Sequence, residues 1–211
     1  MYTPPAFRED DLSTIHALMR ENSFAILVTQ RDGVPLATHL PFMLDTERGP
    51  YGTLIAHMAR ANTQWRAFAE HQEALVIFQG PHAYVTPSWY DPGLNVPTWN
   101  YAAVHAYGVP RLIEDEAALY AMLSRLTATH EAGFEQPWLF EMGEDDFRGK
   151  MKGFVGFEME IIRLEGKMKL SQNRSPVEQE RVAAALAESP NAAVASVGQL
   201  MKQRQEKRRW E

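Results

Sequence analysis

Cysteine is absent from the 211 residues of this chain, and so are long apolar runs. Without thiols the chain cannot form disulfides, thiolate nucleophiles or cysteine-based zinc and iron–sulfur sites. No stretch approaches the roughly 18 consecutive apolar residues of a membrane span, and the N-terminus lacks the charged-then-apolar pattern of a secretion signal. We therefore expect a soluble, cytoplasmic protein with no membrane partner.

The common motifs for phosphate, metal and haem sites are also missing. There is no Gly-x-Gly-x-x-Gly and no P-loop, which excludes a Rossmann or Walker phosphate site. No histidine belongs to a His-Glu-x-x-His or His-x-His pair, and Cys-x-x-Cys-His is absent. Each histidine is therefore better interpreted as a hydrogen-bonded or surface residue, and no metal site is predicted. The seven are His16, His39, His57, His71, His82, His105 and His130.

Charge is unevenly distributed along the chain. The formal net charge of −6 argues against non-specific nucleic-acid binding by the whole protein. Residues 202–209, the basic tail, nevertheless hold five Lys or Arg and one Glu. This tail either contacts DNA phosphates or is the solvated end of a terminal helix, where cations are favourable. The acidic runs 114–116 and 144–146 are interpreted as solvated groups, the first at a helix start and the second in a loop.

Hydrophobic periodicity and turn residues predict many short strands with helices inserted between them. Strands are expected at 24–29, 36–44, 53–58, 75–78, 82–86, 98–107 and 153–163, followed by a turn at Glu165-Gly166 and a strand at 167–170. Helices are expected at 10–21 and 115–131, and after a capping box at 175–178 two more helices follow, separated at 189–191. The short intervals between strands indicate a mostly antiparallel barrel of about six strands.

The chain is organised around an aromatic window at residues 78–108. Seven of the 22 aromatic side chains lie there, with a single acid, Asp91, and no Lys or Arg. Six prolines and glycines break the window into short extended pieces, which excludes a helix. Indoles and phenols also need polar partners when buried. The pattern predicts an aromatic-lined loop between strands, suited to a flat, uncharged ring; alternatively, these side chains only fill one end of the barrel.

A second feature is the junction at residues 57–65, where a predicted strand runs into a predicted helix. Asn62 or Thr63 caps this helix, whose apolar face is Trp65, Phe68 and Ala69. The free N–H groups and dipole of a helix start favour an anion, and Arg60 adds a bidentate donor for phosphate. The plain alternative is an ordinary capped helix beside a surface arginine.

An anion-binding helix start followed by an aromatic platform matches a ligand with a phosphate at one end and a flat ring at the other. Flavin mononucleotide (FMN) has that shape. Trp89, Trp99 or Tyr101 would flank the ring. The side chains that could address the ring or the ribityl hydroxyls are Gln79, Ser88, Asn100 and Gln172.

Five motifs, in order and with their spacing, carry a resemblance to a known family. They are HMARANTQW, IFQGPHAYVTPSWY, VPTWNYAAVHAYG, KGFVGFEMEI and KLSQNR. Together they resemble the PaiB-type, FMN-binding negative transcriptional regulators, from Tyr2 to about Arg174. Two departures stand out: Thr63 replaces the family's usual proline, and little pattern is shared after Arg174.

The resemblance implies an antiparallel split β-barrel, related to pyridoxamine-phosphate oxidases, that forms a homodimer with FMN at the subunit interface. It implies that the strand end and turn at His57, Met58, Ala59, Arg60 and Asn62 bind the phosphate, and that Lys169–Asn173 closes the site. The predicted FMN contacts are His57, Met58, Ala59, Arg60, Asn62, Trp65, Gln79, Tyr84, Ser88, Trp89, Trp99, Asn100, Tyr101, Lys169, Ser171, Gln172 and Asn173.

The expected organisation is a split-barrel FMN domain at 1–174 with flanking helices, and a C-terminal helical extension at 175–211. The expected function is an FMN-binding transcriptional regulator or flavin-sensing protein. Alternatives are a flavin-dependent oxidoreductase acting on a small substrate, or a haem-binding split-barrel protein, since related barrels hold haem. No second cluster of Arg and His is found that would hold a phosphorylated pyridoxamine, so no catalytic residue is assigned.

Overall fold

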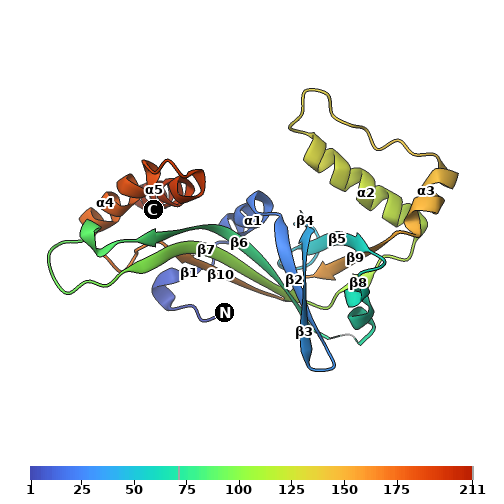
Figure 1. Cartoon of the computed structure of the whole chain (residues 1–211), viewed down its shortest axis with the longest axis horizontal. Coiled ribbons are helices and arrows are strands. Elements are labelled where there is room, and N and C mark those ends of the chain that lie inside the picture. Colours follow the sequence, from blue (N-terminus) through green and yellow to red (C-terminus); the bar gives the residue numbers. More distant parts are fainter. Residues whose placement is uncertain (71, 211) are drawn as a thin grey trace. The chain divides into compact units, whose positions relative to one another are not determined.

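The computed structural model describes residues 1–70 and 72–210, and its strands form two sheets (Figure 1). A six-stranded sheet has the order β1-β10-β7-β6-β2-β3, and a four-stranded sheet has the order β4-β5-β9-β8. The strands are β1 (Arg8–Glu9), β2 (Phe24–Arg31), β3 (Val34–Pro41), β4 (Met43–Asp45), β5 (Thr53–Ala59), β6 (Ala74–Val85), β7 (Thr98–Gly108), β8 (Arg111–Leu112), β9 (Phe154–Glu160) and β10 (Arg163–Lys169). Every pair whose register is described is antiparallel, as predicted.

Helices flank the sheets, and the last two helices follow the final strand in the chain. The α-helices are α1 (Leu12–Glu21), α2 (Glu116–Glu131), α3 (Glu144–Met151), α4 (Pro176–Ala187) and α5 (Ala192–Trp210), with 3-10 helices η1 (Pro5–Phe7), η2 (Thr63–Glu70) and η3 (Pro87–Trp89). Of the described helices, none is both long and apolar enough to cross a bilayer. His71, one of the seven histidines considered above, lies outside the described residues.

The chain divides into two compact units, whose boundaries fall after α1 and within β6, β7 and β10. The first, here called the aromatic unit, comprises residues 1–21, 79–105 and the chain from 165 onward; the second, the hairpin unit, comprises 22–78 and 106–164. The C-terminal helices group with the aromatic unit. The predicted domain boundary at residue 174 remains a prediction.

In the hairpin unit, β2 and β3 form a hairpin. Asp32 and Gly33 turn the chain with φ of 53° and 77°, the left-handed conformations that a tight two-residue turn requires. The core of this unit is aromatic: the Phe42 ring meets Phe78 and Phe157 edge-on at centroid distances of 6.0 and 6.1 Å. These large buried rings stabilise the unit by removing much apolar surface from water.

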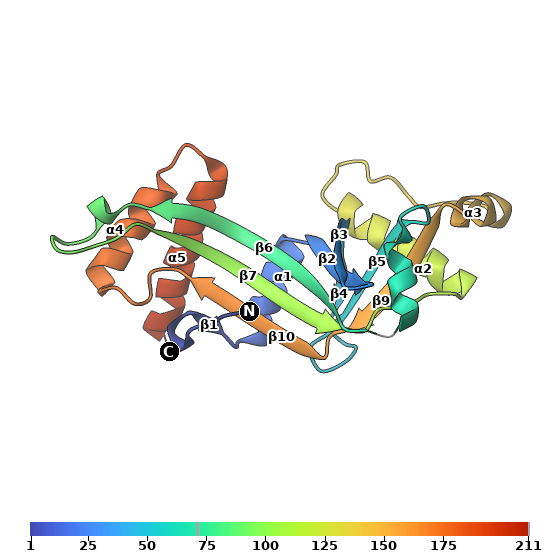
Figure 2. The same cartoon turned by 60° about the horizontal axis from the view of Figure 1, so that its bottom comes forward.

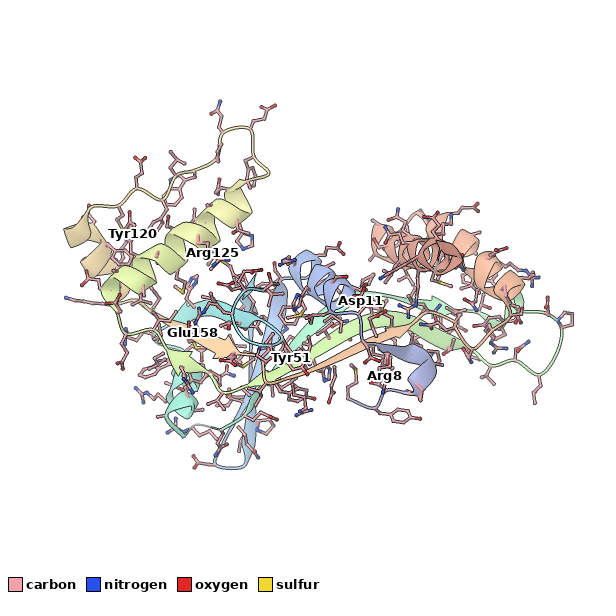
Figure 3. All side chains as sticks on the ribbon, turned by 180° about the vertical axis from the view of Figure 1, so that it is seen from behind. Arg8, Asp11, Tyr51, Tyr120, Arg125 and Glu158 are labelled. Carbon is pink, nitrogen blue, oxygen red and sulfur yellow. The ribbon has the colours of Figure 1, made fainter. Side chains whose placement is uncertain are left out.

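A second apolar layer lies between the four-stranded sheet and helix α2. It contains Met43, Ile55, Leu119, Met122, Leu126 and Phe147, all buried. Tyr120 and Arg125 mark the course of α2 in Figure 3, and Arg125 donates from Nη1 to Asp45 Oδ2 at 3.1 Å. Gly156 of β9 makes the close approach of this helix possible, because a Cβ there would lie 2.4 Å from Leu119 Cδ2.

In the aromatic unit, long strands β6 and β7 pack against helices (Figure 2). Ala83, Val85, Ala102 and Val104 are buried on one face of these strands, while α4 and α5 contribute buried Val182, Leu186, Val197 and Met201. The two helices pack closely at Gly198, where a Cβ would lie 2.3 Å from Ala187 N. Two ion pairs tie α5 to the N-terminal segment: Arg204 with Glu9, and Lys207 Nζ with Asp11 Oδ2 at 2.6 Å.

Several local predictions are confirmed. Asp115 caps α2 by accepting from Ala118 N at 2.7 Å, and Ser175 and Glu178 form the predicted capping box at α4. Both signals lie within four residues of the element they start, so the local sequence determines them.

Other predictions are wrong for tertiary reasons. The predicted strands at 75–78 and 82–86 are one strand, β6, in which Gly80 makes no turn; a Cβ on Gly80 would lie 2.9 Å from Leu18 Cδ1, so this glycine serves a close contact. Glu165 and Gly166 lie inside β10; a Cβ on Gly166 would lie 2.7 Å from Glu9 O, so this glycine serves a close contact. The acidic run at 144–146 begins helix α3 and is not in a loop. The two sheets also hold more strands than the six expected.

Replacing Gly156 with Ala tests the packing of α2 on β9. The added methyl group would overlap Leu119 and Met122, so we expect a loss of about 1–3 kcal/mol in the free energy of unfolding. Urea denaturation measures it. Gly133→Ala is the matched control, because nothing lies within 4 Å of a Cβ at that position. Equal stabilities of the two variants would contradict this account of the layer.

Replacing Glu178 with Gln tests the capping box through its pH dependence. The backbone N–H groups of Ser175 and Asp91 hold the pKa of Glu178 below its usual value. Such a carboxylate contributes stability above its unfolded pKa of about 4.3, and the contribution is lost as pH falls through the lower folded pKa.

Glu178→Gln should therefore have a lower melting temperature at pH 7 and a shallower further fall on acidification than the parent protein. Glu135→Gln, in the exposed segment after α2, is the control and should follow the parent curve. Parallel curves for Glu178→Gln and the parent would show that this carboxylate has no depressed pKa.

Candidate functional site

The turn that follows β5, residues 59–64, is held in place by hydrogen bonds to β9 and to itself. Arg60 N donates to Gly153 O at 2.9 Å, and Arg60 Nη2 donates to Phe154 O at 3.0 Å. Trp65 Nε1 donates to Arg60 O at 3.1 Å, which joins the start of η2 to the turn. The Arg60 side chain is exposed, so a fixed cation lies at the surface of this turn.

A buried glutamine anchors the same turn to the β2–β3 hairpin. Gln64 Nε2 donates to Leu27 O at 3.2 Å, to Thr29 Oγ1 at 3.1 Å and to Leu36 O at 3.2 Å. Thr38 Oγ1 donates to Gln64 Oε1 and accepts from Asn62 Nδ2, the latter at 2.9 Å. Gln64 is only 3% exposed. Sequence reasoning missed Gln64 and Thr38, because only the folded hairpin brings residues 27–38 to this turn.

The helix predicted to begin at Asn62 or Thr63 is present, but its type differs from the prediction. η2 is a 3-10 helix, not an α-helix. Asn62 performs the predicted capping, since its Oδ1 accepts from Gln64 N at 3.1 Å. One of the N–H groups that would attract an anion is therefore already satisfied. The case for an anion at this turn rests mainly on the guanidinium of Arg60.

His57 and Met58 precede the turn, and successive residues of a strand point to opposite faces. Met58 is buried, 2% exposed. His57 lies on the face of Ile55, the face that α2 covers, and its ring meets Phe154 edge-on at 5.8 Å. Burial lowers the pKa of His57, and its Nδ1 is buried without a hydrogen-bond partner. The predicted contacts of these two residues with FMN remain predictions.

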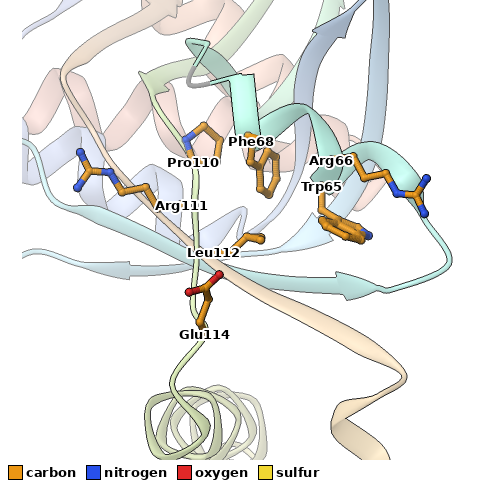
Figure 4. Close-up of a pocket in the computed structure, with 8 residues that line it drawn as sticks. Trp65, Arg66, Phe68, Pro110, Arg111, Leu112 and Glu114 are labelled. Atoms are coloured by element: carbon orange, nitrogen blue, oxygen red, sulfur yellow. The ribbon is translucent and has the colours of Figure 1, made fainter.

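A cavity of about 490 Å³ lies beside the same turn (Figure 4). Its walls are largely apolar, and the guanidinium groups of Arg66 and Arg111 extend from it on opposite sides. The Arg66 guanidinium carbon lies 5.6 Å from the Trp65 ring. The lining residues are Trp65, Arg66, Phe68, Ala69, Pro110, Arg111, Leu112 and Glu114. Among them, only Trp65 was predicted to contact FMN. Residues 110–114 were missed because they reach this place through β8.

In the aromatic unit, part of the predicted platform is present on an exposed face of β6 and β7. Trp99 is 52% exposed, and its ring lies 5.8 Å from His82 and 6.2 Å from Tyr84. Tyr101 lies under Lys167, whose Nζ is 5.1 Å from the ring centroid. The window thus forms strands over most of its length, where an aromatic-lined loop was expected, yet several of its rings still reach solvent.

The remaining predicted contacts also belong to the aromatic unit. Gln79 is exposed on β6, and Ser88 and Trp89 form part of η3. Asn100 Nδ2 donates to Ser171 Oγ at 2.9 Å, and Lys169 Nζ donates to Trp99 O at 2.6 Å, so β7 and residues 169–171 are in contact. Gln172 is occupied locally: its side chain accepts from Leu170 N at 2.6 Å and donates to Met168 O. Asn173 is exposed.

The residues around the 59–64 turn fit an FMN molecule. The volume of the cavity lies within the range of about 300–1,000 Å³ typical of small-molecule sites. Trp65 and Phe68 supply apolar surface for a flat ring, and the nearby guanidinium groups suit a phosphomonoester. No group of three His, Asp or Glu side chains that could hold a metal ion occurs in the described part of the chain.

Comparison with known proteins agrees with this chemistry. A family model described as "Putative FMN-binding domain" matches residues 1–163. The chain is 35% identical over 208 residues to the "Protease synthase and sporulation protein PAI 2" of Bacillus subtilis, covering 98% of this chain and 99% of that protein. It is 34% identical to an uncharacterized protein of Emericella nidulans, covering 82% of this chain and 84% of the relative.

Solved structures share the fold. The flavocytochrome Anf3 of Azotobacter vinelandii superimposes with a TM-score of 0.61 at 19% identity, covering 77% of this chain and 69% of that chain. A FAD and haem binding protein of Mycobacterium smegmatis gives 0.59 at 17% identity, covering 77% and 73%. The predicted antiparallel split barrel is thereby confirmed. The chain belongs to the family of FMN-binding domains that matches its first 163 residues, and the predicted cofactor, FMN, is the cofactor of that family.

Proposed function

We propose that this protein binds FMN at the 59–64 turn and the adjoining cavity, and that it acts as a flavin-sensing transcriptional regulator of the PaiB type. The observation that carries the proposal is the exposed guanidinium of Arg60, held on a turn whose next residue, Trp65, lines an apolar cavity large enough for a flavin. The family match makes FMN the ligand to consider.

Arg60 is suited to the phosphate of FMN. Its one described side-chain hydrogen bond goes to Phe154 O, which leaves further N–H donors of the guanidinium for a ligand. These donors lie in one plane and match two oxygens of a phosphate group. The buried Gln64 network holds the backbone beneath Arg60, so little ordering cost remains when the phosphate binds.

The cavity supplies the apolar part of the site. Trp65 and Phe68 offer ring surface, while Arg66 and Arg111 place positive charge at its edges. FMN, when bound, supplies the redox-active ring system; the protein's own residues hold and orient it.

We further propose a homodimer, which the exposed rings of the aromatic unit support. Tyr84 and Trp99 are 50% and 52% exposed on adjacent strands, and rings of this size are usually covered when they gather on one surface. A second copy of the chain is the partner that the resemblance to PaiB-type proteins implies.

Replacing Arg60 with Ala should weaken FMN binding about 10- to 100-fold, the loss expected for hydrogen bonds to a charged group. Fluorescence titration of the flavin measures it. Binding of riboflavin, which lacks the phosphate, should be unchanged in the same variant. Arg31→Ala, on the exposed hairpin, is the matched control for loss of a surface cation. If FMN and riboflavin weakened equally, or if neither changed, Arg60 would not be the phosphate ligand.

The regulatory part of the proposal predicts that FMN changes the affinity of the protein for DNA. Gel shifts of the fragment upstream of its own gene, with and without saturating FMN, measure it. Of the tail cations, Arg204 and Lys207 are paired with Glu9 and Asp11, so Lys202 is the better one to neutralise. Lys202→Gln should reduce the salt dependence of binding by about one counterion. Absence of any shift at low salt, in both flavin states, would reject direct regulation.

A further inference from the structure

A small, charged cavity in the aromatic unit has a character different from that of the proposed flavin site. Its volume is about 140 Å³, below the range of about 300–1,000 Å³ that suits a cofactor-sized ligand. This space is enough for a single polar group and not for a flavin ring. The lining residues are Tyr90, Val96, Thr98, Asn100, Lys169, Ser171, Asn173 and Arg174.

Two cations line this cavity without a carboxylate partner among the described residues. Lys169 Nζ donates to Thr98 Oγ1 and Trp99 O, both neutral acceptors. Arg174 Nη1 donates to Asn95 Oδ1 at 2.8 Å, and its guanidinium carbon lies 4.0 Å from the centre of the Tyr90 ring. The Tyr90 ring thereby supports the guanidinium from one side, while other N–H groups of both cations remain available for a ligand.

The acid Glu178 is already engaged in hydrogen bonds elsewhere. The positive charge of Arg174 contributes to lowering the pKa of Glu178. Its oxygens accept from Asp91 N at 3.2 Å and from Ser175 N and Oγ at 3.1 and 3.0 Å, as the capping box requires. Glu178 is also not among the residues that line the cavity. No carboxylate is therefore among the described residues that line the cavity with the two cations.

Buried polar groups complete the wall. Asn100 is 1% exposed and Ser171 3% exposed, and they hydrogen-bond to one another. Ser171 has φ of 65°, a left-handed conformation that is uncommon outside glycine and that clusters at binding sites. Burial, together with the charge of Lys167, lowers the pKa of Lys169. Bringing a negative group to such a partly desolvated cation would restore the interactions that it has lost to water.

We propose that this cavity binds one small oxyanion, a phosphate or a carboxylate, between Lys169 and Arg174, and that it does so independently of FMN. The assignment changes the role of Lys169, Asn100 and Ser171 from flavin contacts to the walls of a second ligand site. It therefore goes beyond the proposed flavin function, and it stands whether or not the flavin binds at Arg60.

The probe for this site is inorganic phosphate, which is titrated into the full-length protein. Chloride is lowered as phosphate is added, so that the ionic strength stays constant. We expect a phosphate-dependent rise in melting temperature and saturable binding by calorimetry. Arg174→Gln should weaken phosphate binding at least tenfold. Arg181→Gln is the matched control, because this nearby arginine bonds Trp89 O and Asp91 Oδ1 and does not line the cavity.

A second variant keeps the test informative if Arg174→Gln folds poorly. Asn100→Asp puts a fixed negative charge in the wall of the cavity, next to Ser171. It should abolish phosphate binding while leaving riboflavin binding unchanged. Retention of phosphate binding by this variant, or equal weakening by Arg174→Gln and Arg181→Gln, would overturn the assignment.

Flavin titrations separate the two possible sources of the anion. Saturating FMN should leave phosphate binding intact, and Arg174→Gln should not change the ratio of FMN to riboflavin affinity. If FMN displaces phosphate and Arg174→Gln erases the preference for FMN over riboflavin, the cavity holds the phosphate of the cofactor and the independent site is wrong. Absence of any phosphate-specific effect in the parent protein would also overturn it.

Discussion

The proposed flavin site depends on the hydrogen bonds that the side-chain amide of Gln64 makes. Strand β5 ends at Ala59, and the short 3-10 helix η2 that follows is too weakly hydrogen-bonded to fix a turn alone. The Gln64 amide bonds main-chain oxygens of both β2 and β3, together with Thr29 and Thr38. Breaking this network would leave buried polar groups unsatisfied, at a cost of about 1–3 kcal/mol each. The position of Arg60 is therefore set by the hairpin, through Gln64, and by its own hydrogen bonds to Gly153 and Phe154, more than by η2.

Turns and helix caps that depend on a few neighbouring residues could be predicted from the sequence. The Asp32-Gly33 turn, the Asp115 cap and the Ser175–Glu178 capping box all depend on chemistry within four positions. Glycines were misleading because they have two uses. Gly33 supplies a left-handed turn, whereas Gly80 and Gly166 lie inside strands and make room for side chains and backbone of other elements. Only the folded structure distinguishes these uses.

The candidate site shows the same division. Arg60 and Asn62 were found because a strand end followed by a helix start is visible in the sequence. Thr38, Arg111 and Leu112 were not, since β3 and β8 carry them to η2 by pairing with other strands. The aromatic window was identified as a surface that exposes rings, and Tyr84 and Trp99 do reach solvent, although from strands β6 and β7 and not from a loop. The composition of these segments predicted which side chains they offer to a ligand, whereas the pairing of the strands determines which other residues those side chains lie beside.

The two proposed anion sites also follow from the charge of the chain. Its net charge of −6 gives no general attraction for phosphates or carboxylates, so an anionic ligand must be bound by cations placed locally. Most described arginines cannot do this, because they are paired with acids, as Arg48 is with Glu158 and Arg125 with Asp45. Arg60, Lys169 and Arg174 instead bond neutral oxygens. Neutral partners orient a cation without cancelling its charge, and that combination is what an anion-binding site requires.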